Sequence, residues 1–346
     1  MNWVKAAFVR ASLRVLFFVG CGLLLSACAS LSGFFETQED IPDVRPLVFQ
    51  SEDLVVYRVR AGETAEGLAE RFLKDKSRAW IIEEENEGVP FEEGNFIVIP
   101  LTEKRTGGLA PEGYQTVPIL CYHRLAERCE SALCMTKLLF EEQMRYLKEN
   151  DYRVISMVEL QDFLAYRRRI PRKAVVINLD DGYRSAYEIA YPILKKYNYK
   201  ACLFIYTDFI GASSNSLTWE QLREMKEDGF EVGSHSLSHC DLTKKKQGED
   251  DHRYIKRIRE ELIRSKEIID RKLNQDTTYF AFPYGDYNQL VLSLCEEAGY
   301  KTALSVNRGG NPFFSDPLAL RRDQILRKDM ESFIDTLNTF FDLSLR

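Results

Sequence analysis

Histidine is scarce in this sequence, and positive charge is not in excess. The 346 residues include four histidines, and 53 acidic residues outnumber 47 lysines and arginines, which leaves a net charge of −6. Residues 1–27 contain three basic residues and no acidic one, so the remainder carries −9. Such an acidic chain lacks the basic field by which proteins hold nucleic acid, and we expect no nucleic-acid partner.

The apolar run near the N-terminus is too short to span a bilayer. It extends from Val15 to Leu25, after a basic segment and before Leu25-Ser26-Ala27-Cys28, as in an export signal. This ending resembles a bacterial lipobox, which implies a signal peptide over residues 1–27 and lipidation of Cys28. The alternative is a plain secretory signal. Because no Asp follows Cys28, the resemblance to sorted lipoproteins of Gram-negative cells implies an anchor in the outer membrane, facing the periplasm.

Six cysteines follow this segment, and an exported protein meets an oxidising compartment. Cys129 and Cys134 lie close together in a polar stretch and can pair. Cys240 adjoins His239 and can reach a metal there, although the histidines explain a site without it. The other three have apolar neighbours and are expected to be buried thiols: Cys121, Cys202 and Cys295.

Residues 28–53 show no clear periodicity and are expected to be a tether, followed by a small α+β module over 54–102. The order is an alternating strand at Val55–Val59, two helical segments and a strand at Phe96–Pro100. The order and the following residues resemble a LysM module: Tyr57-x-Val59-x-x-Gly62-Glu63-Thr64, Ile82, Asn86 and Ile97-x-Ile99-Pro100. This resemblance implies binding of N-acetylglucosamine-containing glycans. The alternative is a spacer without sugar affinity, and the acidic run Glu83–Glu85 departs from the pattern.

Residues 103–115 contain several Gly and Pro residues and are expected to be a linker. Strands and helices then alternate over 116–346, which predicts an α/β domain, either barrel-like or doubly wound. Chemistry in such folds gathers at the carboxyl ends of the strands. Asp180, Asp181 and His235 each follow a predicted strand, so we expect them to converge.

Two short segments supply metal-binding chemistry. Asp180-Asp181-Gly182 offers two carboxylates, and His235 and His239 place two of the four histidines four residues apart. On a helical turn this spacing lets both rings face one point. Two imidazoles and the Asp181 carboxylate form a catalytic zinc set with an open position, and Asp180 remains as a base for the bound water. The alternative for each segment alone is a solvated turn or polar loop.

The domain resembles the polysaccharide deacetylases with a NodB-homology domain, carbohydrate esterase family 4. The matching segments are Asn178–Tyr183, Trp219, Gly233-Ser234-His235-Ser236-x-x-His239 and Phe280–Gly285. The resemblance implies a distorted (β/α) barrel that removes acetyl groups from N-acetylated sugars with one divalent metal, expected to be zinc. It also implies a metal site at Asp181, His235 and His239, with Asp180 as the base and the Tyr284 N–H as an oxyanion donor.

The sequence departs from the family pattern at two places. Ala281 and Phe282 stand where many members have an arginine that holds the base. Arg321 or Arg322 can supply that charge, unless they are a surface pair.

The second departure is the general acid. Ile325–Asp329 lacks the late histidine that donates a proton to the leaving amine. His123, after Leu120-Cys121-Tyr122, resembles the early histidine of the subgroup that acts on poly-β-1,6-N-acetylglucosamine. The alternative is a structural histidine.

We therefore expect a lipid-anchored N-deacetylase of a β-linked N-acetylglucosamine polymer, with the β-1,6 exopolysaccharide preferred. A peptidoglycan or chitin-type β-1,4 substrate, an O-deacetylase and an inactive glycan-binding lipoprotein remain open.

Overall fold

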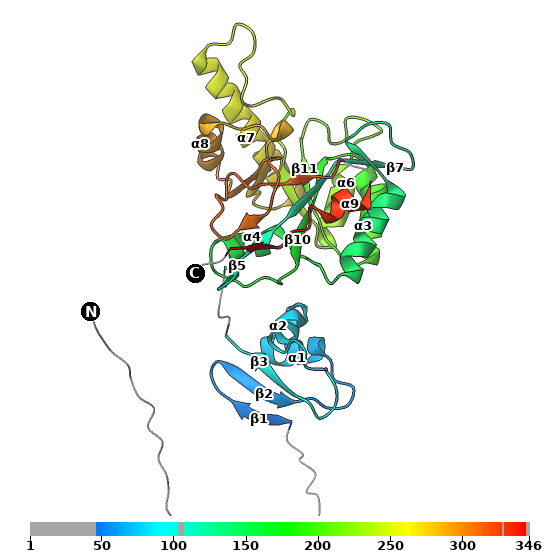
Figure 1. Cartoon of the computed structure of the whole chain (residues 1–346). Coiled ribbons are helices and arrows are strands. Elements are labelled where there is room, and N and C mark those ends of the chain that lie inside the picture. The colour runs from blue at the N-terminus through cyan, green and yellow to red at the C-terminus, as the bar shows by residue number, and fades with distance from the viewer. Residues whose placement is uncertain (1–45, 103–106, 327–328, 344–346) are drawn as a thin grey trace, which may run out of the picture. The chain divides into compact units, whose positions relative to one another are not determined.

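The computed structural model describes residues 46–102, 107–326 and 329–343 (Figure 1). The predicted signal peptide, the predicted lipidation site at Cys28 and most of the predicted tether lie outside these residues. Within them, no helix combines the length and apolar character needed to cross a membrane.

The N-terminal module is a three-stranded antiparallel sheet with helices between its second and third strands. Its elements are β1 (Leu47–Gln50), β2 (Leu54–Arg58), α1 (Ala65–Leu73), η1 (Lys76–Arg78), α2 (Ala79–Glu85) and β3 (Phe96–Pro100), in sheet order β1-β2-β3. The buried Asn86 side chain donates to Ile82 O and Val98 O and accepts from Val98 N, which ties α2 to β3.

The module begins earlier than the sequence predicts. β1 lies within the segment expected to be a tether, where it pairs with β2. All four of its side chains are exposed, so no alternation of buried and exposed residues marked it as a strand.

The second domain is built on a parallel sheet with the order β14-β13-β12-β11-β10-β6-β16. The strands are β6 (Ile119–Tyr122), β10 (Ala174–Asp181), β11 (Cys202–Ile205), β12 (Glu231–Ser234), β13 (Tyr279–Ala281), β14 (Thr302–Leu304) and β16 (Asp323–Gln324), and β9 (Arg153–Val154) pairs with β10. A parallel bridge joins Leu304, at the end of the edge strand β14, to Leu320, three residues before the opposite edge strand β16. The sheet is therefore curled, as expected for a distorted barrel.

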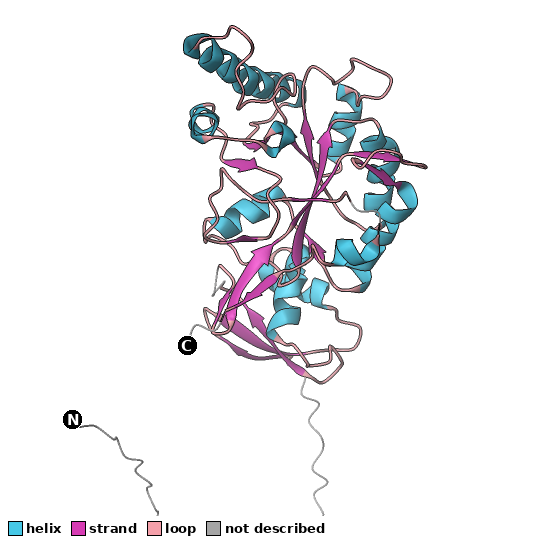
Figure 2. Ribbon diagram, turned by 45° about the horizontal axis from the view of Figure 1, so that its top comes forward, coloured by secondary structure: helices cyan, strands magenta, loops and turns pink. Residues whose placement is uncertain are grey.

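Helices lie around the outside of the central strands (Figure 2). They are α3 (Lys137–Glu149), α4 (Met157–Leu164), η2 (Ala186–Ala190), α5 (Tyr191–Lys196), α6 (Trp219–Glu227), α7 (Asp251–Leu273), α8 (Gln289–Glu297) and α9 (Met330–Ile334). Polar residues cap many of the N-termini: Thr218 and Gln221, for example, form a capping box at α6. The helices bury one face each, which closes the core around the strands.

The predicted linker is also partly structured. β4 (Leu109–Ala110) and β5 (Gly113–Val117) form a second sheet with β15 (Asn311–Pro312) and β17 (Phe340–Asp342). β5 and β6 are divided at Pro118, which has no N–H to continue the ladder. Sequence analysis missed β5 because two of its three partner strands, β15 and β17, are more than 190 residues away along the chain.

A short loop beside the sheet contains the disulfide Cys129–Cys134, as the spacing predicted. The disulfide joins the loop after β7 (Arg124–Ala126) to the first residue of β8 (Cys134–Thr136), and these two strands pair in parallel. Cys121, Cys202 and Cys295 are free and buried, as expected.

Candidate functional site

The site begins where β10 ends. All eight residues of β10 are buried, and its last two are Asp180 and Asp181. The chain then turns through positive φ values of 75° at Asp181 and 83° at Gly182. A Cβ atom at Gly182 would stand 2.7 Å from Ile210 Cδ1, so this tight turn needs glycine.

The two histidines come from the loop after β12, and here the prediction of a helical turn is wrong. Ser236 and His239 both have positive φ, at 73° and 60°, which no helix allows. Ser236 Oγ accepts from His239 N at 2.9 Å, so the serine supports the loop. The loop nevertheless brings the two Nε2 atoms to 3.2 Å.

Helix α7 holds this loop in place through hydrogen bonds to one carboxylate. Glu261 accepts hydrogen bonds from Leu237 N at 3.0 Å, Ser238 N at 2.9 Å and Ser238 Oγ at 2.7 Å. Sequence analysis missed Glu261, because it is one of many charged residues in a long helix and no local pattern distinguishes it.

Asp181, His235 and His239 can hold a divalent metal. Asp181 Oδ1 lies 3.6 Å from His235 Nε2 and 3.4 Å from His239 Nε2. Two ligand atoms bound to a tetrahedral ion at about 2.0–2.1 Å stand about 3.4 Å apart. Asp181 Oδ1 is buried and accepts no hydrogen bond from the described residues, so it is available to a cation.

The protonation states also suit a metal. His235 Nδ1 lies 2.7 Å from Ala281 O, so it carries the proton and Nε2 offers its lone pair. Burial lowers the pKa of His235 to about 3 and also lowers that of His239. Burial and then the charge of Asp180 raise the pKa of Asp181 to about 7. Both disfavour the ionised carboxylate, and a bound cation would favour it.

Asp180 is held by Arg322 rather than Arg321. Arg322 is fully buried, and its Nη1 donates to Asp180 Oδ1 at 2.9 Å, whereas Arg321 is exposed. Burial disfavours the charged carboxylate, but Arg322 and the neighbouring imidazoles outweigh burial and lower the pKa of Asp180 to about 2. Asp180 therefore stays ionised and able to accept a proton.

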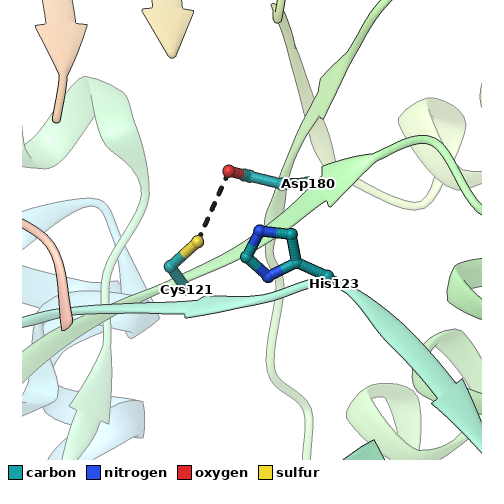
Figure 3. A group of neighbouring side chains, drawn as sticks. All are labelled: Cys121, His123 and Asp180. Atoms are coloured by element: carbon teal, nitrogen blue, oxygen red, sulfur yellow. Dashed lines mark hydrogen bonds between the residues drawn. The ribbon is translucent and has the colours of Figure 1, made fainter. Parts of the chain in front are cut away.

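His123 and Cys121 both lie beside Asp180 (Figure 3). The ligand atoms of these three residues all lie within 4.8 Å of one another, and Cys121 Sγ donates to Asp180 Oδ2 at 3.4 Å. Burial lowers the pKa of His123. Sequence analysis assigned Cys121 only to the core and did not connect it with Asp180.

Aromatic rings border the metal ligands. Tyr284 lies in the turn η3 (Pro283–Gly285) after β13, and its ring is 4.9 Å from that of His239. Tyr206, which directly follows β11, is 5.2 Å from the same ring. Sequence analysis did not single out Tyr206, although its position at the end of a strand could have indicated that it lies at the site. Cys240, which follows His239, has its Sγ atom 3.5 Å from Arg257 Nη1 and is not among the three metal ligands.

Comparison with known sequences gives the same family that the site chemistry indicates. The family model named Polysaccharide deacetylase matches residues 167–303. YxkH of Bacillus subtilis, whose name assigns it to the polysaccharide deacetylases, is 32% identical over 212 residues, which cover 60% of this chain and 71% of YxkH. Poly-β-1,6-N-acetyl-D-glucosamine N-deacetylase of Staphylococcus aureus is 31% identical over 176 residues, and the match covers 48% of this chain and 59% of that relative.

Solved structures agree. Deacetylase PplD of Streptococcus pyogenes, in complex with acetate, has a TM-score of 0.59 and 28% identity, with 65% of this chain and 99% of that chain covered. IcaB of Ammonifex degensii has a TM-score of 0.58 and 25% identity, with coverages of 65% and 97%. The chain thus belongs to the polysaccharide deacetylases of carbohydrate esterase family 4, hydrolases that act on carbon–nitrogen bonds.

Proposed function

We propose that this enzyme is an N-deacetylase of poly-β-1,6-N-acetylglucosamine. The observation that carries the proposal is His123 beside Asp180, within 4.8 Å of it, in a chain that lacks a late histidine. The similarity to the Staphylococcus aureus enzyme, whose name specifies this polymer, supports the same substrate.

A divalent ion, which we propose to be zinc, would be held by Asp181, His235 and His239. When bound, it lowers the pKa of a water and polarises the acetyl carbonyl. Asp180 accepts a proton from the water as its oxygen attacks the carbonyl carbon. Arg322 keeps that carboxylate ionised and in place at 2.9 Å.

The oxyanion and the leaving group need separate donors. The backbone N–H of Tyr284 donates to the oxyanion, a contact that strengthens as negative charge develops. His123 donates a proton to the sugar nitrogen as the carbon–nitrogen bond breaks, which releases acetate and a free amine. The lowered pKa of His123 makes its protonated ring a stronger acid, and the Asp180 carboxylate lies within 4.8 Å of that ring.

Two parts of the chain outside the deacetylase domain bear on where the enzyme acts and on which polymer. We propose that the lipid on Cys28 anchors the protein in the outer membrane, facing the periplasm, and that the module over 54–102 binds glycan as LysM modules do. This module also gives the second candidate function some support, because its resemblance favours β-1,4-linked chains such as peptidoglycan or chitin.

Free-amine release from matched β-1,6 and β-1,4 N-acetylglucosamine oligomers tests the proposal. We expect release from the β-1,6 series, and Asp180→Asn should lower turnover at least about 100-fold while it keeps one equivalent of metal. Release from β-1,4 oligomers alone would replace the exopolysaccharide with cell-wall glycan. No release from either series, with metal bound, would leave glycan binding as the function.

His123 is tested separately. His123→Ala should lower turnover on N-acetylated oligomers by about 100-fold or more, since loss of a general acid has this effect. An aryl acetate, whose leaving group needs no proton, should be hydrolysed by the variant at nearly the wild-type rate. Equal losses on both substrates would give His123 a structural role only.

A further inference from the structure

A second set of metal-binding atoms adjoins the proposed metal centre. Cys121 on β6, His123 just after it and Asp180 on β10 direct a sulfur, an imidazole nitrogen and a carboxylate oxygen toward one point (Figure 3). None of these residues is among the three metal ligands assigned above. The parallel pairing of β6 with β10 sets the two strands side by side, with Cys121 opposite Asn178.

The distances suit a small cation. A sulfur at about 2.3 Å and an oxygen at about 2.0 Å from a tetrahedral zinc stand about 3.5 Å apart. Cys121 Sγ and Asp180 Oδ2 are 3.4 Å apart, and all three ligand atoms lie within 4.8 Å of one another. Small rotations of the three side chains therefore suffice to bind an ion, without movement of a strand.

We propose that Cys121, His123 and Asp180 form a second site for a thiophilic divalent cation, such as zinc, cobalt(II) or cadmium, and that its occupation inhibits the enzyme. The inhibitory part rests on the proposed function, because the second ion takes the base and the general acid as ligands. On binding, the Cys121 thiol loses its proton to solvent and the thiolate sulfur bonds the metal. No oxidant or reductant takes part.

Local charges make this site the weaker of the two. Asp180 Oδ2 lies 3.9 Å from His235 Nε2, so a second ion stands close to the first and the two repel. Arg322 already neutralises Asp180 from the other side. The first equivalent of metal therefore activates the enzyme, and the inhibitory ion binds only at excess.

The donor set also predicts which metals inhibit. A thiolate favours soft and borderline cations, whereas manganese and magnesium prefer oxygen ligands. Excess cadmium or zinc should inhibit, and the same excess of manganese should not.

A cobalt(II) titration of the full-length protein in detergent tests binding without reference to catalysis. We expect two equivalents in the wild type, and only the second should produce the near-ultraviolet band of a cobalt–thiolate bond. Cys121→Ser should bind one equivalent and give no such band. Cys240→Ser is the matched control, because Cys240 also lies near the histidines, and it should behave as the wild type.

His239→Ala provides a second, independent variant. It removes a ligand of the first site only, so the thiolate band should remain. Absence of the band in the wild type, or its persistence in Cys121→Ser, would refute the second site.

Inhibition is measured on enzyme that holds one equivalent of metal, with each variant compared with its own uninhibited rate. We expect Cys121→Ser to require at least about tenfold more cadmium for half inhibition, the range seen for loss of a metal-site contact. Equal inhibition of Cys121→Ser and wild type would overturn the inhibitory role. A protein that is inactive with one equivalent of metal, and that still develops the thiolate band on the second equivalent, would refute the proposed function and leave the second site standing.

Discussion

Arg322 supplies the buried positive charge that faces Asp180. Its guanidinium donates to Asp180 Oδ1 and Ser305 O, both at 2.9 Å, and lies over the Phe204 ring. Arg322→Met leaves Asp180 charged and buried, and loss of one partner from a buried pair costs about 3–5 kcal/mol. We expect the free energy of unfolding of the metal-free protein, measured with urea at pH 7, to fall by that amount.

Two further variants check this reasoning. Arg321→Met, at the exposed neighbouring position, should change the free energy of unfolding by no more than about 0.5 kcal/mol. Asp180→Asn combined with Arg322→Met removes both charges and should recover part of the loss. A double variant as unstable as the two single losses added together would show that the charges do not interact.

The same pair predicts a pH dependence. The pKa of Asp180 falls from 3.8 to about 2 on folding, so its contribution to stability is complete above about pH 5 and is lost as pH falls through 2. Between pH 6 and pH 3 the metal-free wild type should lose about 1 kcal/mol more than the double variant. Parallel losses in the two proteins, measured by urea unfolding at each pH, would contradict the lowered pKa.

At the scale of elements, helix α7 (Asp251–Leu273) positions the metal ligands through Glu261. Two backbone amides and one hydroxyl of the histidine loop donate to this carboxylate. Glu261→Ala should weaken metal binding about 10–100-fold, as loss of a residue that supports metal ligands does. Metal titration by calorimetry measures the change. Glu260→Ala, exposed on the same helix, is the control and should bind as the wild type.

The elements also show what the sequence could predict. β10 is a run of apolar residues that leads directly into Asp180 and Asp181, so both the strand and the position of its carboxylates followed from local pattern. The conformation of the His235–His239 loop did not, because its positive φ values depend on Ser234, Ser236 and the distant Glu261. The choice of Arg322 over Arg321 was likewise fixed by hydrogen bonds to Ser305, just after β14, and to Asp180 on β10, which two adjacent arginines do not reveal.

At the scale of the whole molecule, the hydrophobic core of the module is separate from the buried clusters of the deacetylase domain. The module has its own buried cluster around Leu68, Ile82 and Ile99, and the deacetylase domain buries others around its curled sheet. Each part has a core of its own, which is the usual requirement for independent unfolding. The metal ligands all belong to the second domain, so only that domain gains stability from the ion.

Calorimetry should therefore resolve two thermal transitions, of which metal shifts one. Free metal at 100 times its dissociation constant stabilises the folded site by about 2.7 kcal/mol, and a domain of this size should gain about 5–10 °C. Chelation should remove that gain and leave the transition of the module in place. Ile99→Val, a loss of one buried methyl group in the module, should lower the other transition by roughly 4–8 °C and leave metal affinity unchanged. A single transition that responds to both chelation and Ile99→Val would show that the module and the deacetylase domain unfold as one unit.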